Sequence, residues 1–136
     1  GVTVDIYNIH MDAGRDGDDE KARRKQVVQL LSNIALYSTG QPVIVVGDTN
    51  LKTDKSTVDV EVLQMLLFGA GLTDSCQSLS CPEPHRIDRV MYRSSSNVSL
   101  RAKSWQAETH FVDAAGNPLS DHLPVKVQFE GSYRRP

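Results

Sequence analysis

The sequence predicts an α/β fold in which a mixed β-sheet carries helices on one face. Three observations lead to this prediction. The apolar run at 43–46 is typical of a strand that is covered on both faces. Two longer segments, one on each side of this run, place apolar residues at helical spacing. Two segments near the C-terminus alternate apolar and polar residues, as half-buried strands do.

Length and composition fit one globular domain. The chain has 136 residues, of which 39% are hydrophobic and 24% charged. A net charge of -2 gives no broad positive field that would attract nucleic acid, although a local basic groove is still compatible with it. No apolar run is long enough for a transmembrane segment.

The first strand is expected at 2–9, followed by a polar loop and a helix at 20–38. Gly40 and Pro42 end this helix. Its apolar stripe consists of Val27, Leu30, Leu31, Ile34 and Tyr37. The basic residues at 21–25 are assigned to a solvated helix face, because acidic residues lie four positions before two of them, Arg23 and Arg24.

The buried strand at 43–46 is followed by a helix at 58–68, so the order strand, helix, strand suggests a right-handed crossover. Further strands are expected at 86–93, 98–105 and 123–130. The prediction is thus five strands and two helices, with the last three strands as antiparallel neighbours in one mixed sheet. The apolar face of the second helix contains Val62, Leu63, Leu66, Leu67 and Ala70.

Four short motifs place polar side chains at the ends of the predicted strands. They are N-I-H at 8–10, G-D-T-N at 47–50, R-I-D-R-V at 86–90 and S-D-H-L-P-V at 120–125. Strand ends on one rim of a sheet converge, and α/β proteins build sites there. Carboxylate and carboxamide oxygens suit Mg²⁺ or another hard divalent ion, and paired His and Asp suit proton transfer. With no evident serine or cysteine nucleophile, the motifs indicate phosphate-ester hydrolysis by water.

Each motif also has a purely structural interpretation. Asp48 and Asn50 could form a turn after a strand. His10 could be an ordinary loop histidine, Asp88 could pair with a neighbouring arginine, and Asp121 could belong to a turn. Judged singly, these alternatives remain open.

The two cysteines, Cys76 and Cys81, lie five positions apart in a polar loop. They could close a small disulfide ring, which would favour a secreted or periplasmic protein, or they could be free thiols. A zinc site would add His85, but the spacing matches no familiar zinc motif.

In this order, the four motifs resemble the C-terminal half of the endonuclease/exonuclease/phosphatase superfamily. The resemblance covers nearly the whole chain and implies that residues 1–136 are a single partial domain, about half of a four-layer α/β/β/α sandwich. The segment R-I-D-R-V-M-Y at 86–92 and the serine-tryptophan pair at 104–105 resemble the sphingomyelinase branch. Nucleases and phosphatases share the same catalytic motifs, so the resemblance leaves the substrate open.

The resemblance implies a role for each motif residue. His122 is expected to be the general base that activates water, and Asp88 the carboxylate that orients its imidazole. Asp48 and Asn50 are expected to position the nucleophile and the phosphate oxygens. His10 is expected to hydrogen-bond the phosphate in the transition state.

The resemblance also implies a metal site. Its expected ligands in this chain are Asp121, Asp48 and Asn50, with Mg²⁺ or another hard divalent cation bound. The principal metal-binding glutamate of the superfamily belongs to the N-terminal half of the fold, which this sequence does not contain. Weak or no catalysis by the isolated chain is therefore expected.

The same half would cover the inner face of the sheet. Because a large exposed apolar face usually marks an interface, self-association as a dimer is expected through residues such as Val125, Val127 or Val45. The expected substrate is a phosphoester, with a phospholipid favoured and nucleic acid possible. Two other functions are considered: a nuclease or inositol-phosphate phosphatase of the same superfamily, and a non-catalytic binding or assembly module.

Overall fold

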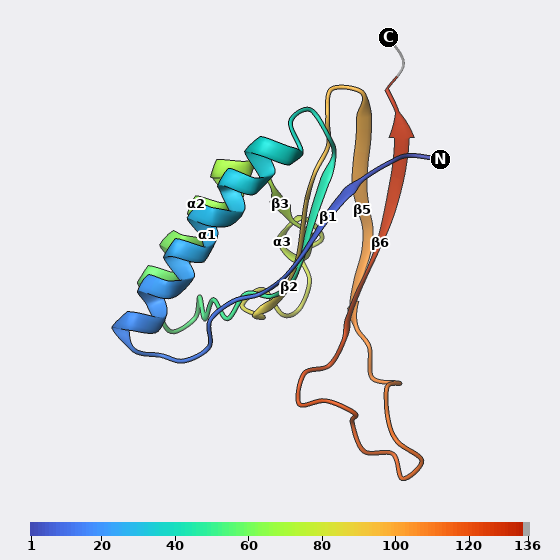
Figure 1. Ribbon diagram of the computed structural model, residues 1–136. Coiled ribbons are helices and arrows are strands. Elements are labelled where there is room, and N and C mark those ends of the chain that lie inside the picture. Colours follow the sequence, from blue (N-terminus) through green and yellow to red (C-terminus); the bar gives the residue numbers. More distant parts are fainter. Residues whose placement is uncertain (135–136) are drawn as a thin grey trace.

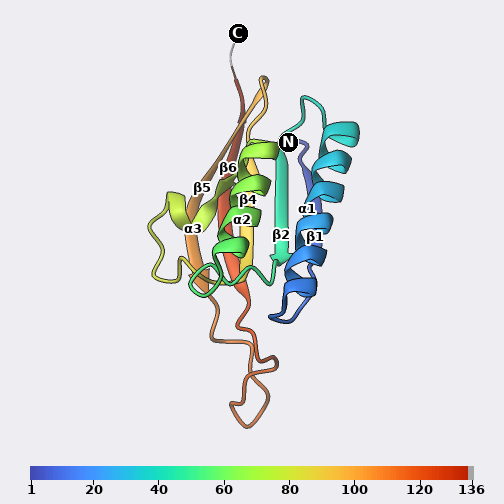
Figure 2. The ribbon, with the colours of Figure 1, turned by 90° about the vertical axis from the view of Figure 1, so that its left-hand side faces the viewer.

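The structure is a computed structural model that describes residues 1–134. Figure 1 shows three layers, with two long helices on one side of a four-stranded sheet and a long β-hairpin on the other. Figure 2, viewed from the helical side, places the hairpin behind the sheet. The elements in chain order are β1 (Asp5–His10), α1 (Gly17–Tyr37), β2 (Val43–Asp48), α2 (Thr57–Ala70), β3 (Thr73–Asp74), α3 (Ser75–Ser78), β4 (Asp88–Arg93), β5 (Val98–Ala107) and β6 (Val125–Tyr133).

The sheet is mixed, as predicted. Its strand order is β1-β2-β4-β3, with β1 parallel to β2 and β4 antiparallel to both β2 and β3. The expectation that the last three strands are antiparallel neighbours holds for β5 and β6 and is wrong for β4. Within the described residues β5 and β6 pair with each other in a separate two-stranded sheet, and β4 pairs with β2 and β3. Tyr92 of β4 packs edge-on against Phe129 of β6 at 5.2 Å between ring centroids, so the hairpin contacts the four-stranded sheet through side chains.

Helix α1 begins three residues earlier than predicted because of a capping box. The Asp16 carboxylate accepts hydrogen bonds from the backbone N–H groups of Asp18 and Asp19, and the Asp19 carboxylate accepts one from Asp16 N at 2.9 Å. The short elements β3 and α3, of two and four residues, were missed because they are too short to show a period.

The core lies between the helices and the sheet. Successive side chains of a strand point to opposite faces, so Val43 and Val45 of β2 face the helices and are 0% exposed. The expectation that Val45 lies on an uncovered face is therefore wrong. Other buried members of this core include Val27, Ile34, Val62, Leu66 and Met91.

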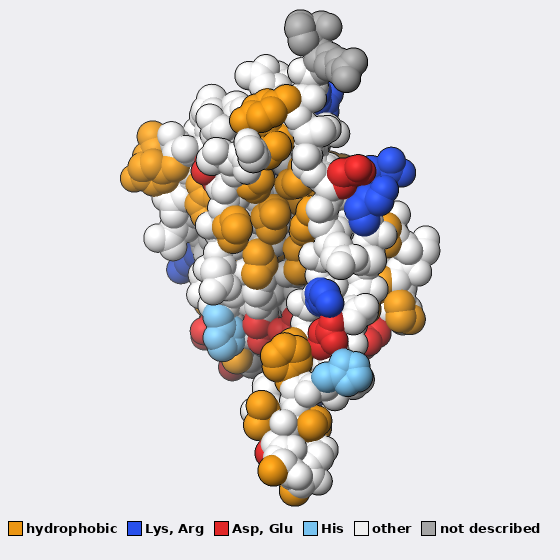
Figure 3. All heavy atoms as spheres, turned by 90° about the vertical axis from the view of Figure 1, so that its right-hand side faces the viewer, with side chains coloured by type: hydrophobic (Ala, Val, Ile, Leu, Met, Phe, Trp, Pro, Cys, Tyr) orange, Lys and Arg blue, Asp and Glu red, His pale blue; other side chains and the backbone are white. Residues whose placement is uncertain are grey.

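The opposite face of the sheet is only partly covered by the hairpin. Ile6 of β1 is 65% exposed there, whereas Val125 and Val127 of β6 are half-buried. Figure 3 shows apolar side chains gathered over the middle of the molecule seen from the hairpin side, with acidic side chains and histidines along its lower part. An apolar surface with polar groups at one edge thus lies on the non-helical side.

One basic residue assigned to a solvated surface is instead buried. Arg23 is 1% exposed and forms an ion pair with Asp59 of α2, at 3.0 Å from Nε to Oδ1. The interpretation as a solvated helix face fails for Arg23 because its partner is 36 residues away and cannot be recognised from helical spacing. Arg24 is exposed and pairs with Glu61 across the two helices at 3.0 Å.

Candidate active site

Three polar side chains from three different strands lie in one row at the edge of the sheet. The register pairs His10 of β1 with Asp48 of β2, and Asp48 with Asp88 of β4. Because β1 and β2 are parallel and β4 is antiparallel, the row joins the last residues of two strands to the first residue of the third. By strand alternation, the row lies on the face opposite the helices.

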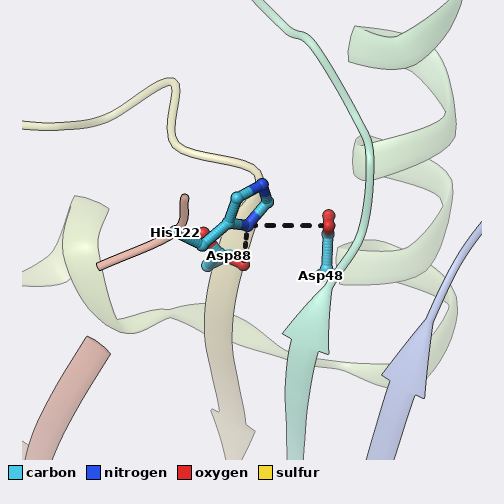
Figure 4. Close-up of side chains that lie close together, drawn as sticks. All are labelled: Asp48, Asp88 and His122. Atoms are coloured by element: carbon cyan, nitrogen blue, oxygen red, sulfur yellow. Dashed lines mark hydrogen bonds and ion pairs between the residues drawn. The ribbon is translucent and has the colours of Figure 1, made fainter. Parts of the chain in front are cut away.

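His122 completes the cluster from the segment that precedes β6. Its Nδ1 lies 3.1 Å from Asp88 Oδ1 and 3.8 Å from Asp48 Oδ2 (Figure 4). A carboxylate can only accept a hydrogen bond, so the short contact places the proton on His122 Nδ1. The neutral ring then keeps an unprotonated Nε2, which is the arrangement of an imidazole that can accept a proton from a ligand.

The carboxylates also raise the pKa of His122. The hydrogen bond to Asp88 and the charge of Asp88 are the largest causes, and the charges of Asp48 and Asp121 add to them. Partial burial of the ring opposes this shift, because it disfavours the charged form. The imidazole therefore remains protonated to a higher pH than the ordinary value of 6.5 allows.

His10 lies on the other side of Asp48. Its Nε2 is 3.7 Å from Asp48 Oδ2, and its side chain is 75% exposed. The contact is at the long end for an ion pair and leaves the ring largely in solvent. Asp48 therefore lies between two imidazoles, with a side chain that is 16% exposed.

Asn50 is held in a sharp turn behind the row. Its backbone has a positive φ of 50°, its N–H donates to Asp48 Oδ1 at 2.8 Å, and its Nδ2 donates to the carbonyl of Met11 at 3.0 Å. The turn interpretation of Asp48 and Asn50 is thus part of the geometry, and it ties the loop after β2 to the loop after β1. Asn50 is 6% exposed, so its amide is rigidly placed beside the cluster.

Asp121 does not enter the cluster. Asp121 is exposed, and its carboxylate accepts a hydrogen bond from Ser120 Oγ at 3.5 Å. Its assignment as a metal ligand stays a prediction. Asp88 does contact Arg86, at 3.4 Å from Oδ2, so the alternative of a neighbouring ion pair coexists with the contact to His122.

The cluster fits a small cation by its chemistry. Asp48, Asp88 and His122 each offer one ligand atom, and these atoms lie within 4.8 Å of one another. Two carboxylates provide hard oxygens and negative charge, which suit a hard divalent ion. The identity of such an ion is not determined by this set.

Gly47 opens the G-D-T-N motif, but no role at the site was predicted for it from the sequence. A Cβ on Gly47 would lie 1.9 Å from the carbonyl oxygen of Ile9, and φ at this position is +134°. Glycine therefore permits the close approach of β1 and β2 just before His10 and Asp48. A glycine inside an otherwise apolar strand was the available signal.

The loop before β4 is closed by a disulfide bond between Cys76 and Cys81, which is one of the two alternatives considered for these cysteines. The disulfide excludes them as zinc ligands. His85 is instead within hydrogen-bonding distance of Thr53, at 3.0 Å from Nδ1 to Oγ1. No helix among residues 1–134 is long and apolar enough to cross a membrane.

The chain is similar in sequence to mycobacterial proteins named sphingomyelinase. The chain is 32% identical over 145 aligned residues to proteins named sphingomyelinase from Mycobacterium bovis and from Mycobacterium tuberculosis. The alignment includes 95% of this chain but 28% of each relative, so the chain spans about a quarter of their length. No protein-family model matches the chain.

Solved structures share the fold. Zebrafish TDP2, in a structure described as complexed with a single-strand DNA product, superposes with a TM-score of 0.72 at 20% identity, covering 92% of this chain and 55% of that one. The human nocturnin catalytic domain gives a TM-score of 0.64 at 24% identity, covering 95% and 46%. A mannosyl-6-phosphatase from Bacteroides thetaiotaomicron gives 0.59 at 23% identity, covering 92% and 50%. The chain thus corresponds to about half of each of these structures.

Proposed function

Because the chain has the fold of the endonuclease/exonuclease/phosphatase superfamily, we propose that it is part of a metal-dependent phosphodiesterase with a phospholipid as substrate, as in the sphingomyelinases it resembles. The observation that carries this proposal is the contact of 3.1 Å between His122 and Asp88, with Asp48 beside it at the edge of the sheet. A carboxylate-oriented imidazole next to a pair of carboxylates suits hydrolysis by activated water.

In this proposal His122 is the general base. Its Nδ1–H donates to Asp88, so its Nε2 faces outward with a free lone pair and takes a proton from the attacking water. The imidazolium that forms is stabilised by the charges of Asp88 and Asp48. The base acts in its neutral form, so the hydrolysis rate rises with pH as His122 loses its proton. Because the pKa of His122 is raised, this rise occurs at higher pH.

The other residues of the cluster orient the phosphate. His10 is exposed beside Asp48 and is in place to hydrogen-bond a phosphate oxygen, and buried Asn50 fixes the turn that holds Asp48. A hard divalent cation held by Asp48, with Asp121 and Asn50 as further proposed ligands, would supply positive charge against the phosphate oxygens. Mg²⁺ is the proposed ion.

A phospholipid is favoured over nucleic acid by the loop that leads to His122. This loop, residues 109–121, extends away from both sheets at the lower end of Figure 1, and all of its residues are exposed. Phe111 and Leu119 are 56% and 67% exposed, so apolar side chains are presented to solvent on the loop that leads to His122. Aromatic and aliphatic side chains on such a loop suit contact with a lipid surface. The net charge of -2 does not favour a polyanion.

The isolated chain is proposed to be a poor catalyst. It corresponds to about half of the similar structures. From the order of its motifs we propose that it is the C-terminal half of the domain. The principal metal-binding glutamate of the superfamily would then lie outside residues 1–136. Robust Mg²⁺-dependent turnover by the purified chain would refute this part of the proposal.

The assay that tests the function uses the native gene product that contains this chain. It is given sphingomyelin vesicles, plasmid DNA and an inositol phosphate, each with MgCl₂ and with EDTA as the control. Release of phosphocholine is the expected result. DNA nicking without lipid hydrolysis would favour the nuclease alternative, and no turnover of any substrate would favour a non-catalytic binding or assembly module.

A matched pair of variants separates loop contact from catalysis. Phe111→Ser removes an aromatic side chain from the loop beside the site, and Phe68→Ser removes one that is 82% exposed on α2, in the helical layer. We expect the first variant, and not the second, to reduce activity on vesicles while activity on a soluble phosphodiester is retained. Equal effects of both variants would contradict a role for the loop at the lipid surface.

A further inference from the structure

Arg86 lies between the loop that carries His122 and the carboxylate that holds its ring. The Arg86 side chain is 14% exposed. Its Nη2 donates to the backbone carbonyl of Leu123, the residue that follows His122, and also lies 3.4 Å from Asp88 Oδ2. A single guanidinium nitrogen therefore contacts both the backbone and the side chain that determine the position of the imidazole.

The two oxygens of Asp88 are divided between these partners. Oδ1 accepts from His122 Nδ1 at 3.1 Å, and Oδ2 faces Arg86. Free rotation of the carboxylate would break both contacts, so Arg86 fixes the orientation in which Oδ1 is presented to the imidazole.

The loop has few other connections to the sheets. Residues 109–121 are all exposed, and the base of the loop is closed by a hydrogen bond from Glu108 N to the carbonyl of Pro124 at 2.8 Å. Within residues 1–134, the hydrogen bonds and ion pairs that side chains make between the sheet region and residues 109–124 are those of His122 itself and the bond from Arg86. Arg86 therefore supplies the hydrogen bond that ties the backbone next to His122 to the sheet region.

Arg86 is itself held in place. Its Nη1 donates to Glu83 Oε2 at 2.7 Å, and its backbone N donates to the carbonyl of Glu83 at 3.1 Å. The N–H of Glu83 contacts Cys81 Sγ at 3.3 Å, and Cys81 is fixed by its disulfide to Cys76. A short, cross-linked segment thus orients the guanidinium toward β4 and the loop.

We propose that Arg86 is a positioning residue that holds His122 against Asp88. This inference rests on the proposed role of His122 as the base, and Arg86 acts through that residue and not on the substrate. A planar guanidinium can bond Glu83 with one nitrogen and Leu123 with the other, whereas the ammonium of a lysine has no such fork.

The test uses the 136-residue chain without metal and reads the imidazole directly. Arg86→Lys keeps the positive charge and removes the fork. Arg93→Lys is the control, because Arg93 is the last residue of β4, the strand that follows Arg86, and also bonds backbone carbonyls, those of Ala70 at 2.8 Å and Ser38 at 2.7 Å, away from the loop. Nitrogen-15 NMR at high pH reports the tautomer of His122, and amide hydrogen exchange reports the mobility of residues 120–125.

In the unchanged chain His122 is expected as the Nδ1–H tautomer. Arg86→Lys is expected to give a mixture of tautomers and exchange at 120–125 that is at least about tenfold faster, since a hydrogen bond from a charged donor is lost. Arg93→Lys is expected to change neither. Glu83→Gln, which leaves Arg86 in place but weakens its support, is expected to move both signals in the same direction by less.

An unchanged tautomer and unchanged exchange in Arg86→Lys would overturn the inference, and so would equal changes in Arg93→Lys. These signals do not depend on turnover. If the native gene product hydrolyses no phosphoester but Arg86→Lys still alters the His122 signals, the proposed function fails while the positioning of His122 by Arg86 is supported.

Discussion

The buried ion pair between Arg23 and Asp59 gives the most quantitative prediction. Both side chains are 1% exposed, and Asp59 accepts from Arg23 Nε at 3.0 Å and from Nη2 at 3.4 Å. Replacing Asp59 with alanine leaves a charged guanidinium in the core, which costs about 3–5 kcal/mol. It also removes the acceptor of the Lys52 N–H bond at 3.0 Å, worth about 1 kcal/mol more.

The expected loss of unfolding free energy is therefore about 4–6 kcal/mol, a large part of the ~5–15 kcal/mol that holds a typical domain together. Urea denaturation followed by far-ultraviolet circular dichroism measures it. Glu61→Ala, which breaks the exposed pair with Arg24, is the control and is expected to cost less than about 1 kcal/mol. A loss below about 1 kcal/mol for Asp59→Ala would refute the claim that this pair anchors the two helices.

Three further predictions concern the site and the open face. Asp88→Asn is expected to lower the pKa of His122 in an NMR titration of the metal-free chain, since Asp88 is the main cause of its elevation; an unchanged pKa contradicts the contact. The pair of His122 and Asp88 stabilises the folded state fully below pH 6.5, and this stabilisation is lost as the pH rises through the raised pKa of His122. Gly47→Ala is expected to lower the free energy of unfolding, measured in urea, by about 3 kcal/mol or more, because the new Cβ would meet the Ile9 carbonyl. An unchanged free energy of unfolding would contradict the close approach of β1 and β2. Ile6→Glu, at a side chain that is 65% exposed, is expected to weaken self-association in sedimentation velocity. A wild-type chain that is monomeric at all concentrations would contradict that expectation.

The sequence predicted the long elements well, because their patterns are local. The apolar stripe of α1 follows a helical period, and the short continuous apolar run at 43–46, ended by a glycine, is typical of a strand covered on both faces. The placement of β5 and β6 in a second sheet was missed, since alternation along a strand indicates a half-buried face but not which sheet the strand joins. The orientation of Val45 was missed for a related reason: a strand with apolar residues at every position does not indicate which set faces the helices.

Part of the site could also be anticipated from its motifs. Strand-end positions suggested that Asp48, Asp88 and His122 would meet, and the structure brings these three together. The same reasoning could not place Asp121, because its position depends on the exposed loop and not on a strand. Arg86 was treated only as a possible ion-pair partner of its neighbour, since its bond to the carbonyl of Leu123 joins residues 37 positions apart.

The most direct test of the account is the turnover of sphingomyelin by the native gene product with His122 replaced by glutamine. Glutamine retains a side chain of similar reach but cannot accept the proton. We expect kcat to fall by about 10²–10⁴-fold, as for the loss of a general base, while binding to sphingomyelin vesicles is unchanged. A His122→Gln variant that retains the kcat of the unaltered protein would contradict the account.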